Sequence, residues 1–278
     1  MGWQIVFYLF YGLISGLAEI LPVSASAQGY ILSELTALDT RNPLMMLMMH
    51  AACCIVLLIN FRQRIGHMRR ELQLELQDPK RRKRQPDRIT VLDTKIALFA
   101  AIPMMIMLAL SNVCYNRFAS LISLSITLVI SGIAIYVPQF KPGANRDSRH
   151  LSPAEGVRLG LLAGLSMFPG ISRMGLFLSS GLQRGCAKKY ILDIALLASI
   201  PAMFMLILLD IVALFAAGFA TIDGRMILLS CVCAVSTFGG AWLGVVVMRF
   251  LSMNANYSAL AYYCWGLGLF SFILYLMV

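Results

Sequence analysis

Two stretches of the chain, GLISGLAEILPVSAS at residues 12–26 and GLLAGLSMFPGISRM at residues 160–174, align with each other without a gap. The matching positions, at a constant offset of 148 residues, are Gly12, Leu13, Gly16, Leu17 and Ser24 in the first and Gly160, Leu161, Gly164, Leu165 and Ser172 in the second. Each stretch also contains a proline, which interrupts a helix because it has no amide hydrogen to donate. The matches indicate an internal repeat of two broken helices, although small residues also recur by chance where apolar helices pack.

The composition places the chain in a membrane. Hydrophobic residues make up 59% and charged residues 13% of the sequence, far from the balance of soluble domains. About 20 helical residues cross the hydrocarbon core, and six apolar stretches reach that length. They lie at residues 43–61, 91–111, 118–137, 191–217, 226–248 and 258–278. Two further segments, 3–35 and 155–183, are apolar but broken by the repeated motif.

The basic residues predict an orientation. Residues 62–95 hold eleven of the 23 lysines and arginines, including the run from Lys80 to Arg84. A nucleic-acid patch is conceivable, but the positive-inside bias favours a cytoplasmic loop over residues 62–94, and we expect no nucleic-acid partner. If both broken segments return to the side they left, nineteen basic residues face the cytoplasm and both termini lie outside. The outward-facing basic residues are then Arg41, Arg117 and Arg225, and Arg173 lies at membrane depth.

Three spans follow each broken segment. Because an odd number of spans reverses the orientation of whatever comes next, the halves at about 1–140 and 150–278 are predicted to be inverted copies. The expected fold is an all-α integral membrane protein with one domain over residues 1–278. It has six full transmembrane helices and two re-entrant helix pairs in an inverted-topology repeat.

The polar residues at the two breaks predict an anion site. Irregular backbone at membrane depth requires surrounding protein or water, and the helix after each break offers free amides. Ser24 and Ser26 at one break, with Ser172 and Arg173 at the other, add hydroxyls and a guanidinium. The alternative is that the serines only cap their helices. An arginine at mid-membrane costs about 2.5 to 3.5 kcal/mol on insertion scales, so Arg173 needs a partner or a function, and Glu19 is the candidate partner.

The sequences AEILPVSASAQ at 18–28 and FPGISRMG at 168–175 resemble the two signature motifs of the bacterial undecaprenyl diphosphate phosphatase family, often called BacA. The resemblance implies a multi-pass enzyme of the bacterial cytoplasmic membrane that recycles the carrier lipid of peptidoglycan synthesis. It would hydrolyse a polyprenyl diphosphate to the monophosphate at a site open to the extracytoplasmic side. We also expect a divalent cation, Mg²⁺ or Ca²⁺, with Glu19 as its ligand, and a homodimer.

Matching the motifs position by position assigns the expected site residues. The catalytic set is Glu19, Ser24 and Arg173, and the substrate-binding set is Ser26, Gln28, Gly170, Ser172 and Gly175. Departures from the family pattern occur at Ser15, Ala25, Ala27, Gln28 and Phe177. Ser15 stands where a glutamate or glutamine is expected, and Gln28 stands where a histidine is expected. Phosphate binding is therefore better supported than hydrolysis.

Gln28 is the most consequential departure, because a glutamine cannot act as a general base near neutral pH. Loss of general acid or base help costs about 10²- to 10⁴-fold in rate. His50 and Asp210 lie in apolar spans and could reach the cavity in place of the motif histidine. The simpler interpretation is that His50 packs inside the bundle and that Asp210 lies at the outer interface of the membrane. Two functions follow: a phosphatase with an altered proton-transfer route, or a degenerate relative that binds or translocates the lipid without cleaving it.

Overall fold

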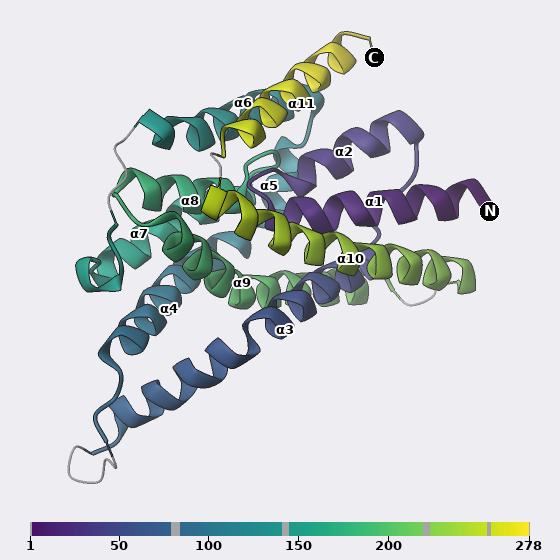
Figure 1. Cartoon of the computed structure of the whole chain (residues 1–278). Coiled ribbons are helices and arrows are strands. Elements are labelled where there is room, and N and C mark those ends of the chain that lie inside the picture. Colours follow the sequence, from purple (N-terminus) through teal and green to yellow (C-terminus); the bar gives the residue numbers. More distant parts are fainter. Residues whose placement is uncertain (1, 79–83, 141–144, 219–222, 255–256, 278) are drawn as a thin grey trace.

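The computed structural model describes residues 2–78, 84–140, 145–218, 223–254 and 257–277. Within these ranges the chain is helical, as expected (Figure 1). The α-helices are α1 (Gly2–Ile20), α2 (Ala25–Thr36), α3 (Pro43–Leu76), α4 (Arg88–Leu108), α5 (Ser111–Phe118), α6 (Leu121–Tyr136), α7 (Pro153–Gly164), α8 (Arg173–Gln183), α9 (Lys188–Ala217), α10 (Gly224–Asn254) and α11 (Ser258–Met277). The basic residues at 80–83 and Lys141 lie outside the described residues.

Seven helices in the described part of the chain are long and apolar enough to cross a membrane. Six of them, α3, α4, α6, α9, α10 and α11, correspond to the predicted spans. The seventh is α1, which runs unbroken for 19 residues before the interruption at Pro22, so the first broken segment already contains a helix of spanning length. The predicted re-entrant path of this segment stays a prediction.

The outward faces of the long helices are apolar. Ile106 on α4, Val235 on α10 and Leu276 on α11 are 66%, 75% and 68% exposed. Large exposed apolar patches on this scale are stable in contact with lipid and not with water. Together with the seven long helices, this surface makes the chain a multi-pass membrane protein.

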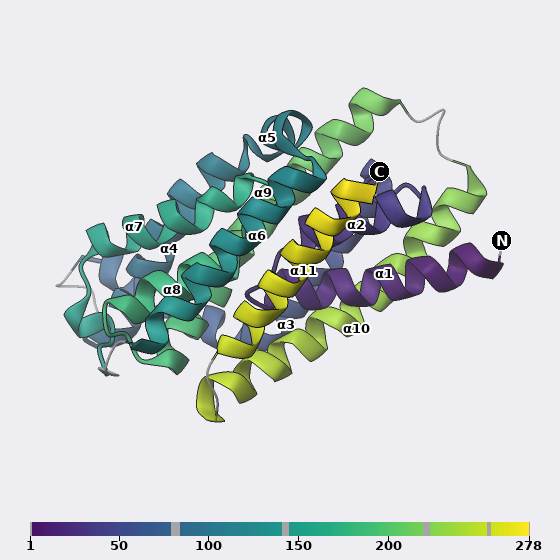
Figure 2. The ribbon, with the colours of Figure 1, turned by 90° about the horizontal axis from the view of Figure 1, so that it is seen from above.

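Two close helix pairs depend on glycines of the repeated motif. A methyl group at Gly12 of α1 would overlap the carbonyl oxygen of Cys233 on α10, and one at Gly160 of α7 would overlap the carbonyl oxygen of Ala100 on α4. Small residues allow such close backbone approach between membrane helices. The pairs α1 with α10 and α7 with α4 are among the most extensive contacts of the structure. A third extensive pair, α6 with α11, lies between these two pairs in the view of Figure 2.

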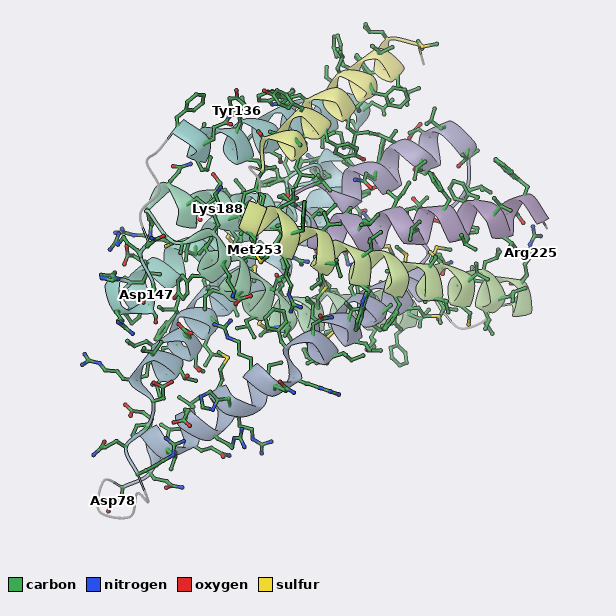
Figure 3. All side chains as sticks on the ribbon, viewed as in Figure 1. Asp78, Tyr136, Asp147, Lys188, Arg225 and Met253 are labelled. Atoms are coloured by element: carbon green, nitrogen blue, oxygen red, sulfur yellow. The ribbon has the colours of Figure 1, made fainter. Side chains whose placement is uncertain are left out.

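Charged side chains gather at one end of the helices. Figure 3 shows them around the ends of α3 and α4, near Asp78, and around Asp147, whereas Arg225 lies at the opposite end. At the charged end, Arg64 of α3 donates to Asp193 of α9 at 2.6 Å and to Asp93 of α4 at 3.1 Å. This cluster joins three long helices and fixes the position of α3 relative to α9, the two helices that carry His50 and Asp210.

Candidate active site

The first break positions Glu19 and two serines. Glu19 lies in the last turn of α1, and Ser24 caps α2 by accepting from the amide of Ala27 at 3.3 Å. The Ser24 and Ser26 hydroxyls are 3.1 Å apart, with Ser24 buried and Ser26 exposed. Ser24 is therefore a helix cap, and its hydroxyl also lines the cavity described below.

The second break is braced by α6. Gly170 has φ = +90°, a conformation that favours glycine, and Ser172 caps α8 by accepting from the amide of Gly175 at 3.0 Å. Ser131 of α6 donates to the Gly170 carbonyl and accepts from the Ser172 amide, both at 3.1 Å. These bonds satisfy backbone groups that the break leaves unpaired inside the protein, and they set the start of α8, where Arg173 is the first residue.

The two breaks meet. The amide of Gly170 donates to the Ser26 hydroxyl at 3.4 Å, and Arg173 Nη2 donates to Glu19 Oε2 at 2.7 Å. Arg173 is buried, with 8% of its surface exposed. The structure thus brings together the carboxylate of the first motif and the guanidinium of the second. The Nε donor of this guanidinium has no partner among the described residues.

A cavity of about 150 Å³ lies against this ion pair. Its polar lining includes Ser15, Glu19, Ser24, Ser26, His50, Arg173 and Asp210. Its apolar lining includes Met46, Met49, Met167, Leu206 and Leu209. An apolar cavity with a few converging polar groups is the usual form of a small-molecule or lipid headgroup site.

His50 and Asp210 form a second polar pair in the same cavity. His50 Nδ1 lies 2.6 Å from Asp210 Oδ2, and His50 Nε2 lies 4.0 Å from Glu19 Oε1. Both residues reach the cavity, as the sequence allowed, and Asp210 is buried, with 9% of its surface exposed. The only signal in the sequence was that both are ionisable residues within apolar spans.

Several predicted binding residues lie beside the cavity without lining it. Gln28 is buried on α2, and its Oε1 has no partner in the described part of the chain. Gly170, Ser172 and Gly175 shape and cap the second break, as described above. Their backbone and side chains position Arg173, and their assignment to substrate binding stays a prediction.

Arg41 is a lining residue that sequence reasoning placed only on the outer side. Its guanidinium carbon lies 3.4 Å from the centre of the Tyr115 ring, and its Nη2 donates to Asn112 Oδ1 at 3.4 Å. All three residues line the cavity. A cation held over an aromatic ring is well placed to attract an anionic headgroup towards Arg173.

The protein donors do not form a ready site for a resident cation. No group of three or more histidines, cysteines, aspartates or glutamates in the described ranges could hold a metal ion. Glu19 is paired with Arg173, and Asp210 with His50. A Mg²⁺ ion at Glu19 would need substrate phosphates and water for the rest of its shell, so we derive no step through a metal, and the Mg²⁺ or Ca²⁺ expectation stays a prediction.

Comparison with known proteins decides the family. The family model described as "Bacitracin resistance protein BacA" matches residues 8–270. The chain belongs to the BacA family. This confirms the resemblance that the two motifs indicated, and it extends over nearly all of the BacA chain described here.

Curated relatives of this BacA chain carry the name undecaprenyl-diphosphatase. The protein of Nocardioides sp. is 29% identical over 196 residues, which is 69% of each chain. That of Halothermothrix orenii is 22% identical over 267 residues, or 96% of each chain, and that of Carboxydothermus hydrogenoformans is 25% identical over 260 residues, or 94% of this chain and 93% of the relative. These are distant relatives of nearly equal length, so family membership leaves the activity of this BacA protein to be argued from its site.

Proposed function

We propose that this protein hydrolyses a polyprenyl diphosphate, with undecaprenyl diphosphate as the first candidate, to the lipid monophosphate and inorganic phosphate. The observation that carries the proposal is the meeting of Arg173 and Glu19 beside the Ser24 and Ser26 hydroxyls in one cavity. The name of the relatives supports the substrate class. The apolar side of the cavity, with Met46 among its residues, suits the first isoprene units.

The cavity offers groups that stabilise a transferring phosphoryl group. Phosphoryl transfer needs positioning and stabilisation of negative charge more than covalent chemistry from the protein. Arg173 lines the cavity and supplies a guanidinium. The first amides of α2, from Ala25 and Ser26, have no acceptor within their own helix and belong to lining residues. Ser24 and Ser26 hold the attacking water, and Glu19 fixes the guanidinium at the phosphate.

The proposal places the site at the centre of an inverted repeat. With a 148-residue offset, α1 corresponds to α7 and α4 to α10, and the contacts α1 with α10 and α7 with α4 exchange under this correspondence. Gly12 and Gly160 make the close approach in each pair. We infer that the two breaks are re-entrant and that the charged end in Figure 3 faces the cytoplasm of a bacterial inner membrane. Both termini, and the part of the cavity that Arg41 lines, then face outwards.

A second function, binding or moving the lipid without cleaving it, is favoured by one observation. Arg173 and Glu19 neutralise each other directly, and joining the two halves of the bundle is a sufficient role for such a pair. The replacement of the motif histidine by Gln28 points the same way.

Phosphate release from undecaprenyl diphosphate by the purified protein in detergent, with and without Mg²⁺, separates the two functions. We expect release by the wild type and a loss of about 10²- to 10³-fold in Arg173→Ala, the typical effect of removing a group that stabilises transition-state charge. Arg225→Ala is the matched control, because Arg225 lies exposed at the end of α10 and contacts Gln4. Lipid binding without any release by the wild type would establish the second function instead.

A further inference from the structure

His50 is the one histidine that reaches the cavity. The chain has three, and the other two, His67 and His150, have side chains that are 46% and 57% exposed and pair with Glu71 and Asp147. The His50 side chain is 9% exposed. Burying an ionisable histidine at membrane depth costs free energy, and such residues usually mark a functional site. Two carboxylates and a guanidinium lie beside His50.

The contacts of His50 fix which of its nitrogens can act. Asp210 Oδ2 accepts from Nδ1 at 2.6 Å, which orients the ring and places the hydrogen of the neutral imidazole on Nδ1. Nε2 then carries a lone pair. It faces Glu19 Oε1 at 4.0 Å, which is beyond hydrogen-bond distance, so Nε2 is not committed to a protein partner there.

We propose that His50 is the general base of the hydrolysis, a catalytic residue, and that Asp210 is its positioning residue. This inference rests on the proposed phosphatase function. It also supplies, from α3 instead of α2, the proton-transfer group that Gln28 cannot provide.

His50 moves one proton during the hydrolysis. Nε2 takes a proton from the attacking water while the water oxygen bonds to the terminal phosphorus. The bond from that phosphorus to the bridging oxygen breaks, and its electron pair stays on the lipid monophosphate. The imidazolium then gives its proton to water in the cavity, which restores the neutral imidazole. Arg173 stabilises the charge on the transferring phosphoryl, and Asp210 stabilises the imidazolium between the two proton transfers.

Other residues of the cavity are less suited to the role. Glu19 accepts from Arg173 at 2.7 Å and is held in that ion pair. Three charged groups face His50 among the described residues: Glu19 from α1, Arg173 from α8 and Asp210 from α9. Cys53, on the same helix as His50, also lines the cavity. Two carboxylates against one guanidinium favour an imidazolium formed during the reaction.

Kinetics of three variants test the assignment. In His50→Gln we expect the turnover number to fall by about 10²- to 10⁴-fold with little change in KM, because only a group acting in the transition state is lost. The fall in kcat/KM on the acidic side of the pH profile should disappear. Asp210→Asn should lose about 10- to 100-fold and shift that side of the profile. His67→Gln is the matched control, with the same substitution on the same helix, and should leave the rate and the profile unchanged.

Imidazole rescue separates catalysis from folding. His50→Ala should regain activity when imidazole is added, with a pH dependence that follows free imidazole, while lipid binding stays as in the wild type. A wild type that releases no phosphate overturns both this assignment and the proposed function. An active wild type with an active His50→Gln, or with a His50→Ala that imidazole does not restore, overturns the role of His50 alone.

Discussion

Neutralising Glu19 should destabilise the protein more than its partial exposure suggests. Glu19→Gln leaves Arg173, 8% exposed, without a counter-charge inside the bundle. Breaking a buried pair from one side costs about 3 to 5 kcal/mol, and an arginine at a helix centre costs about 2.5 to 3.5 kcal/mol on insertion scales. Because the Glu19 side chain is 19% exposed to the cavity, we expect a loss near the lower end, about 2 to 3 kcal/mol in the free energy of unfolding.

A double-mutant cycle isolates the pair. Unfolding in mixed micelles would be followed for the wild type, Glu19→Gln, Arg173→Gln and the double variant. If the two side chains stabilise each other, the double variant loses less than the sum of the two single variants, by about 2 kcal/mol, within the range for contacting residues. The exposed contact of Arg225 with Gln4 at the end of α10 provides the control, where Arg225→Gln should change stability by less than about 0.5 kcal/mol.

Additive losses would refute the reasoning. They would mean that Glu19 and Arg173 do not interact in the folded protein, and the site as described would then have no basis. A single-variant loss below that of the Arg225 control would have the same meaning.

Four further predictions follow from particular contacts. Gly12→Ala should cost about 1 to 3 kcal/mol of stability by overpacking α1 against α10, whereas Gly266→Ala, which meets nothing nearby, should not. Arg41→Ala should raise KM for the lipid diphosphate and leave the turnover number unchanged, because Arg41 lines the cavity and contacts Tyr115 and Asn112, not the Glu19–Arg173 pair. Mg²⁺ should not raise the melting temperature of the lipid-free protein, since the described residues offer no cluster of three metal ligands. A hydrogen bond from Thr90 holds the pKa of Asp87, the N-cap of α4, below its usual value. The stabilisation by this cap is therefore full above about pH 4 and is lost as the pH falls further. In urea unfolding, the free energy of unfolding of Asp87→Ala should fall less over that pH range than that of the wild type.

Much of the site was predictable because charge and proline are costly in a membrane. Pro22 and Pro169 locate both breaks, and the cost of an isolated charge predicts that Arg173 needs Glu19. The environments of His50 and Asp210 could not be predicted, since they lie 160 residues apart in helical segments, the first half of α3 and α9, that are apolar on nearly every face. Such helices give no periodic signal for the direction in which a given residue points.

The missing signal for side-chain direction also explains why Gln28 lies outside the cavity lining. The motif match predicted Gln28 in the cavity, but motif spacing does not define how the short helix α2 is rotated, and the side chain is buried outside the lining. The break at Pro22 agrees with the structure, since α1 continues to Ile20 and nearly all of the irregular backbone lies between Leu21 and Ser24.

The ion pair at the centre of the molecule has a consequence for how such a protein can be built. At the 148-residue offset, Glu19 corresponds to Met167 and Arg173 to Ala25, so each copy of the motif carries one of the two charges. Under the proposed symmetry the counterpart of the Glu19–Arg173 contact is Met167 with Ala25, so two identical copies would form the ion pair twice or not at all. Joining both copies in one polypeptide lets each mutate independently, and only then can the cavity hold a single ion pair on one side of the axis.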